Sequence, residues 1–100
     1  MARFAIAFDL EQDMLRQTYG NPSYQNAYGD IKKVLARYGF SGQQGSVYFG
    51  DDSVDAVRTV MVAQRLARDF PWFVPSVRDI RMLRIEDDND LMQAIRPDEE

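Results

Sequence analysis

The sequence contains neither cysteine nor histidine among its 100 residues. Without cysteine there are no disulfide bonds and no thiol nucleophiles. Without histidine the protein lacks the commonest acid–base group and metal ligand at neutral pH, so a structural zinc site is not expected. Any metal ion would have to be a hard cation held by oxygen atoms, such as Mg²⁺ or Mn²⁺.

Long apolar runs are also absent. No run approaches the ~20 residues that a membrane span requires, and residues 1–3 lead into a strand-like segment without the apolar stretch of a signal peptide. We therefore expect a cytoplasmic protein that does not enter a membrane. A chain of 100 residues with 45% hydrophobic residues is typical of one folded domain.

The net charge of −4 argues, taken alone, against a nucleic-acid partner. The charges are unevenly distributed, because 7 of the 16 acidic residues lie in residues 86–100, whereas residues 1–85 hold 11 basic and 9 acidic residues. Ten of the 12 basic residues are arginine, which suits bidentate phosphate contacts. We predict a domain over residues 1–87 and an acidic tail over residues 88–100, although a merely solubilising tail explains the charges equally well.

The first half of the chain reads as a strand, a helix and a second strand region. Residues 3–10 alternate larger and smaller apolar side chains, which predicts a strand buried on both faces. After a short helical turn, Asn21 and Pro22 look like an N-cap and a first helical residue, and Gly39 ends that helix. Residues 40–50 form either one bent strand or a hairpin.

The second half supplies a further helix and a final strand. We expect Asp52 or Ser53 to cap a helix that runs to about Arg68, followed by an aromatic loop and a strand over residues 76–86. The apolar stripe of this helix is expected at Val54, Val57, Met61 and Gln64, with Val60, Ala63 and Ala67 beside it. Counting the middle region as a hairpin gives βαββαβ. This is a ferredoxin-like α+β fold, an antiparallel sheet with two helices on one face. The other face is free for a second copy or a ligand.

Three segments taken in order resemble a known family. They are AFDL ending the first strand, YGF at residues 38–40 followed by QGSVY at residues 44–48, and SVRDIR at residues 76–81 leading into IED at residues 85–87. This combination is similar to virulence-associated protein D, an endoribonuclease family, and the resemblance covers the chain from Arg3 to about Asp87. That family is similar in turn to the small CRISPR-associated nuclease used in spacer acquisition.

The resemblance implies a ferredoxin-like homodimer that cleaves RNA, with Asp9 of each subunit near the dimer axis. It also implies a toxin held in check by a small antitoxin. We therefore expect an endoribonuclease acting on single-stranded RNA. The alternatives are a non-catalytic dimeric module that binds nucleic acid or protein, and a spacer-acquisition scaffold that binds DNA.

Asp9 is the first candidate for catalysis and for binding a divalent ion. From the sequence alone, a cap for the following turn is the simpler role, and the resemblance selects Asp9 for the site. One carboxylate makes a poor metal site, so a second is needed, which dimer symmetry could supply. Ser46 is the second candidate, for placing the scissile phosphate, whereas its plainer role is that of a turn residue beside Gly45.

Asp79 joins the catalytic candidates only through the resemblance, since a salt bridge to a neighbouring arginine is its ordinary role. Arg78, Arg81 and Arg84 recur every third residue, so a regular strand puts Arg78 and Arg84 on one face and Arg81 on the other. They either grip an RNA backbone or pair with Glu86, Asp87 and Asp88 at a dimer edge.

Aromatic residues are weaker candidates. Trp72 and Phe73 lie between two prolines, and we expect them to pack rather than to stack on bases. Tyr48 is a remote candidate for a general acid, because an unperturbed tyrosine has a pKa of ~10.

Overall fold

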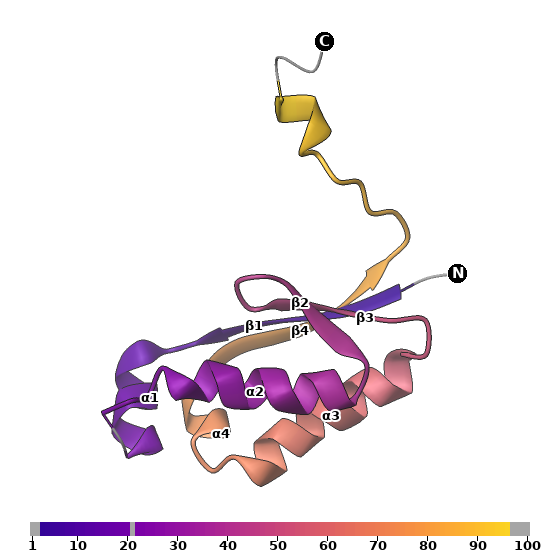
Figure 1. Cartoon of the computed structure of the whole chain (residues 1–100). Coiled ribbons are helices and arrows are strands. Elements are labelled where there is room, and N and C mark those ends of the chain that lie inside the picture. The colour runs from indigo at the N-terminus through magenta and orange to yellow at the C-terminus, as the bar shows by residue number, and fades with distance from the viewer. Residues whose placement is uncertain (1–2, 21, 97–100) are drawn as a thin grey trace.

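The computed structural model describes residues 3–20 and 22–96 of the chain (Figure 1). Four strands form one antiparallel sheet in the order β2-β3-β1-β4. The predicted ferredoxin-like α+β fold is confirmed, with residues 40–50 forming the hairpin. In chain order the elements are β1 (Arg3–Leu10), α1 (Gln12–Tyr19), α2 (Asn26–Arg37), β2 (Phe40–Gln44), β3 (Val47–Gly50), α3 (Ala56–Asp69), α4 (Phe73–Ser76), β4 (Val77–Ile85) and the 3₁₀ turn η1 (Gln93–Ile95).

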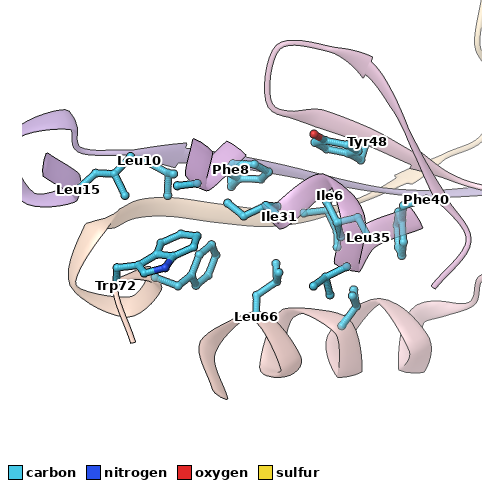
Figure 2. Close-up of a cluster of buried hydrophobic side chains, with 14 of the residues drawn as sticks. Ile6, Phe8, Leu10, Leu15, Ile31, Leu35, Phe40, Tyr48, Leu66 and Trp72 are labelled. Atoms are coloured by element: carbon cyan, nitrogen blue, oxygen red, sulfur yellow. The ribbon is translucent and has the colours of Figure 1, made fainter. Parts of the chain in front are cut away.

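Helices α2 and α3 cover one face of the sheet, and we call the other face the open face (Figure 1). The central strand β1 directs Ile6, Phe8 and Leu10 into the core between the sheet and the helices (Figure 2). Its alternate residues belong to the open face, where Ala5 is fully buried and Asp9 is exposed. The expectation of burial on both faces therefore holds for the middle of β1 but not for its end.

Both long helices begin later than predicted. Helix α2 starts at Asn26, so Pro22 lies in the preceding turn and not at the first helical position, while Asn21 lies outside the described residues. The cap of α3 is Asp55, whose carboxylate accepts the Arg58 N–H at 2.8 Å. The end of α2 matches the prediction, because Gly39 has a φ of 93°.

The predicted stripe of α3 is wrong. Thr59, Val62 and Leu66 are the buried residues of this helix, whereas the side chains of Val57 and Met61 are 67% and 53% exposed. The helix carries apolar residues around most of its circumference, so its periodicity does not define which arc meets the sheet.

Strand β4 ends the sheet as an edge strand and is exposed along most of its length. Beyond it the described chain leaves the sheet and reaches η1 (Figure 1). The division into a domain over residues 1–87 and a tail over residues 88–100 stays a prediction, and residues 97–100 lie outside the described part. Within the described ranges, no helix combines the length and apolar character that a membrane crossing requires.

Candidate active site at one end of the open face

Asp9 and Asp79 are direct partners in the antiparallel ladder between β1 and β4. Residues directly opposite each other in such a ladder have Cα atoms about 4.5–5.5 Å apart and side chains on the same face. Asp9 lies on the open face, so Asp79 lies there too. Two of the three predicted catalytic residues therefore come together within one chain.

A bulge next to this pair brings in two arginines. The ladder passes from Asp9↔Asp79 to Leu10↔Val77, which leaves Arg78 as an extra residue on β4. Arg78 Nε lies 3.2 Å from Asp9 Oδ2, and Arg81 Nε lies 2.9 Å from Asp79 Oδ2. We call Asp9, Arg78, Asp79 and Arg81 the charged quartet.

The electrostatics of the charged quartet are balanced but open to solvent. Like charges directly opposite on neighbouring strands destabilise a sheet, and the two guanidinium groups offset this repulsion. The side chains are 59% exposed at Asp9 and 46% exposed at Asp79. Ion pairs this exposed contribute only about 0–1 kcal/mol, so another anion or cation can replace either partner at low cost.

Arg84 does not belong to the charged quartet. It lies opposite Phe4, on the helix-covered side of the ladder, and its Nε is 2.9 Å from Glu86 Oε2. The prediction that Arg78 and Arg84 share a face is wrong, because the bulge turns Arg78 toward Asp9. Arg84 pairs with Glu86, as the alternative expectation had it, but within one chain; pairing at a dimer edge stays a prediction.

Ser46 lies at the same end of the sheet. The Phe8 N–H donates to the Ser46 carbonyl at 3.1 Å, which extends the β1–β3 ladder by one residue and sets Ser46 opposite Phe8. Alternation then assigns the Ser46 side chain to the helix-covered face. The structure thus brings Ser46 next to the strand end that carries Asp9, but not into the charged quartet.

The aromatic candidates lie in the core. Trp72 and Phe73 are buried, and the Trp72 ring contacts Tyr19 and Phe70 at centroid distances of 5.4 and 4.7 Å. This confirms packing rather than base stacking. Tyr48 stacks on Phe8 at 6.1 Å, and its burial raises its pKa, which makes it a poorer proton donor.

The sequence did not identify one residue that holds the strand ends beside the charged quartet, Ser76. Ser76 is fully buried, its carbonyl accepts the Glu11 N–H at 2.7 Å, and its hydroxyl lies 3.1 Å from that of Thr18. The Glu11 contact ties the end of β1 to the start of β4 just beyond the bulge, and the Thr18 contact ties α1 to the same point. No local sequence pattern predicted the burial of Ser76, because its partners Glu11 and Thr18 are distant in the sequence.

The oxygen chemistry of the aspartate pair suits a hard divalent cation such as Mg²⁺ or Mn²⁺. Over residues 3–20 and 22–96, however, no cluster of three or more acidic side chains is positioned to hold a metal ion. Two carboxylates of one chain are thus available, each already paired with an arginine.

Comparison with known proteins finds several relatives that are similar to this chain over nearly its whole length. No protein-family model matches it. It is 45% identical to Endoribonuclease VapD 2 of Riemerella anatipestifer, over 92% of this chain and 98% of that protein. It is 46% identical to an Endoribonuclease VapD homolog of Helicobacter pylori, over 93% of this chain and 96% of that protein. Endoribonuclease VapD of Dichelobacter nodosus is 42% identical, over 93% and 97%. The chain therefore belongs to the VapD endoribonuclease family.

Proposed function

We propose that this protein is an endoribonuclease that cleaves single-stranded RNA at the charged quartet. The observation that carries the proposal is the facing pair of Asp9 and Asp79 with an arginine at each carboxylate. Relatives named as endoribonucleases, similar over nearly their whole length, support RNA as the substrate.

Each member of the charged quartet has a role that follows from its chemistry. Arg78 and Arg81 bind the scissile phosphate, exchanging carboxylate oxygens for phosphate oxygens. Asp9 and Asp79, released from these partners, orient the attacking hydroxyl and accept its proton. Ser46 positions the end of β1 from the neighbouring strand. Arg84, exposed on the helix-covered side of the edge strand, holds RNA backbone that extends past the edge of the sheet.

Two nucleophiles are compatible with these roles. Attack by the RNA 2′-hydroxyl leaves a cyclic phosphate, whereas attack by water leaves a linear phosphate. Mass spectrometry of the product ends distinguishes the two. A divalent ion bound by Asp9, Mg²⁺ or Mn²⁺, would supply positive charge at the phosphate and lower the pKa of a bound water. A cyclic product would contradict the version with an attacking water.

We propose further that the protein acts as a homodimer with the two copies of Asp9 near the axis. Ala7 and Val47 are ladder partners on the open face, two ladder positions from Asp9, and both are only half-buried in the single chain. Two copies packing through this apolar row would bring their aspartates together. Light scattering of the wild type and of Val47→Lys tests this, because a wild-type monomer at working concentration would contradict it.

The biological role we propose is that of a cytoplasmic toxin restrained by a small antitoxin protein. The family resemblance supports this role. Induced expression should arrest growth, and the Asp9→Asn variant should not. Co-expression of a small neighbouring reading frame should relieve the arrest. Growth arrest that persists in Asp9→Asn would contradict toxicity through RNA cleavage.

Cleavage of a labelled single-stranded RNA, with and without Mg²⁺, tests the central proposal. Asp9→Asn should lose activity, whereas the matched control Asp13→Asn should retain it, because Asp13 is an exposed acid paired with Arg16 on α1. If the folded wild type binds RNA without cutting it, the protein is the non-catalytic binding module. Equal cutting by wild type and Asp9→Asn would place the chemistry elsewhere.

A further inference from the structure

An apolar groove runs along the outer edge of the sheet, between α3 and β4. Its volume is about 300 Å³, and we call it the edge groove. Its apolar walls include Val60, Ala63 and Ala67 of α3 and Ile80 and Met82 of β4. Arg81 is the one charged residue among the described residues that line it.

The register of β4 shows which side of the sheet the edge groove belongs to. Ile80 lies opposite Phe8 and Met82 lies opposite Ile6, so both side chains are on the helix-covered side. Ile80 and Met82 are nevertheless 37% and 45% exposed, because β4 is the last strand of the sheet. Packing of two copies through the open face therefore leaves the edge groove accessible.

Helix α3 continues this apolar surface beyond β4. Val60, Ala63 and Ala67 are three and four residues apart, so they share one arc of the helix. This arc is not the buried one, since the side chain of Val60 is 47% exposed and Ala67 is exposed as well. The apolar residues expected beside the stripe of α3 are thus left uncovered by the fold.

A strand added beside β4 would fill the edge groove. The edge strand is nine residues long, and every second residue of such a strand presents its backbone N–H and C=O outward. An added strand would lie about 4.8 Å away and direct alternate side chains toward α3. Proteins bind extended segments in this way, with affinity from the main chain and specificity from alternate side chains. The groove therefore suits an extended segment with apolar residues at alternate positions.

The charges of β4 select an acidic segment. The side chains of Arg81 and Arg84 are 70% and 66% exposed, and carboxylates opposite them on an added strand would be favoured. A second copy of β4 would not fit. Antiparallel pairing about Arg81 would set Arg81 against its own copy and Arg78 against Arg84, and like charges directly opposite are destabilising.

We propose that the edge groove receives an extended segment of a partner protein, in which apolar residues alternate with acidic ones, as a strand added to β4. The partner is the small antitoxin proposed above. A carboxylate of the segment binds Arg81 in competition with Asp79 and with the RNA phosphate, so the bound segment inhibits cleavage. The inhibition rests on the proposed function, whereas binding of the segment does not.

The probe is a phage-displayed library of random nine-residue peptides, selected on the full-length protein. The enriched peptides should carry an acidic residue between two apolar ones. Val60→Glu puts a carboxylate into the groove wall and should weaken binding of the selected peptide at least about tenfold. Met61→Glu is the matched control, because Met61 is 53% exposed on the same helix and does not line the edge groove. Ala67→Glu decides the result if Val60→Glu is misfolded by circular dichroism.

Methylation of the peptide backbone tests strand addition. In an added strand, alternate N–H groups donate to β4 and the others point away. N-methylation of one alternate set should abolish binding, and N-methylation of the other set should leave it intact. Equal effects of the two sets would overturn strand addition. A peptide that binds at Val60 should also slow RNA cleavage when it saturates the protein, and unchanged cleavage would overturn the inhibition.

The outcomes separate this docking surface from the proposed function. Peptide binding that Val60→Glu weakens, in a protein that cuts no RNA, supports the docking surface and overturns the nuclease. RNA cleavage with no enriched peptide, or with binding unchanged in Val60→Glu and Ala67→Glu, overturns the docking surface alone. Enriched peptides that match residues 88–96 would assign the groove to the tail of this chain. A lower mass of Val60→Glu in light scattering would assign it to a second copy, and either result overturns the proposal.

Discussion

Asp9 faces Asp79 across the β1–β4 ladder, so two like charges meet on the open side of the sheet. Such a pair lowers the stability of a sheet unless other charges compensate it. The arginines on either side of Asp79 supply this compensation, each to a different carboxylate. The arrangement is better explained by function than by stability, because uncharged residues at both positions would remove the conflict.

Replacing an arginine of the charged quartet should expose the repulsion between the aspartates. We expect Arg81→Gln to lower the free energy of unfolding by about 0.5–1 kcal/mol. In an Asp79→Asn background the same substitution should lower it by less. Urea denaturation in a double-mutant cycle measures this coupling. Arg84→Gln is the matched control, since its partner Glu86 is likewise two residues away and 2.9 Å distant. Equal effects of the two substitutions would contradict a special role for the aspartate pair.

The same arginines should separate catalysis from general RNA binding. Arg78→Gln and Arg81→Gln should each lower kcat at least about tenfold, because a charge-assisted contact to the reacting phosphate is lost. Arg84→Gln should leave kcat unchanged and reduce the salt dependence of RNA binding by about one charge. Single-turnover cleavage and salt titrations provide these values. A lower kcat in Arg84→Gln would mean that the reacting phosphate lies farther along β4.

Core packing of α3 distinguishes the observed orientation from the predicted one. Leu66 is fully buried, whereas the side chain of Val60 is 47% exposed. Leu66→Ala should destabilise the protein by about 2–5 kcal/mol, and Val60→Ala should change stability by less than about 0.5 kcal/mol. Thermal or urea unfolding measures both. A larger loss of stability in Val60→Ala than in Leu66→Ala would support the apolar stripe of α3 predicted from the sequence.

Two glycines should respond in opposite directions to alanine. Gly29 lies inside α2, and an added Cβ there meets nothing within 4 Å, so Gly29→Ala should stabilise the protein by about 0.5–1 kcal/mol. At Gly50 an added Cβ would lie 2.8 Å from the Cβ of Val54, so Gly50→Ala should destabilise it. Melting temperatures that rise or fall together would contradict the packing of Val54 against the end of β3.

Alkaline pH should destabilise the fold through Tyr48. Burial raises the pKa of Tyr48 above its ordinary value of 10.0, so the unfolded chain loses this proton first as the pH rises. The contribution to stability is complete below pH 10.0 and is lost above it. Tyr48→Phe should match the pH profile of the wild type up to that point and then decline less steeply. Urea midpoints between pH 8 and about 11.5 test this, and parallel curves throughout would contradict it.

Local patterns predicted the order of the strands and helices well. The alternation in residues 3–10 and the paired glycines of residues 40–50 are signals within single elements, and both elements formed as expected. The ends of helices were less predictable. Asp52, Ser53 and Asp55 are all good capping residues, so the local sequence does not distinguish them, and in the structure Asp55 is the cap.

The candidate site depends on register, which no local pattern contains. The resemblance selected Asp9 and Asp79, but their direct opposition follows from the register of β1 on β4, and the bulge at Arg78 shifts the ladder by one residue immediately beyond this pair. A shift of one residue exchanges the faces of a strand, which is why the spacing of the arginines misassigned Arg78. Ser46 shows the reverse case, since it lies one ladder position from Asp9 and faces the other side.

The arginines of β4 also affect solubility, because β4 is an exposed edge strand. A strand that ends a sheet and carries apolar residues such as Ile80 and Met82 is a template on which further chains can add, and so a starting point for aggregation. Charged side chains at regular intervals along that edge oppose such addition. Removing Arg78, Arg81 and Arg84 together should therefore produce insoluble protein rather than a soluble, inactive enzyme, so the residues proposed to bind RNA would also keep the protein in solution.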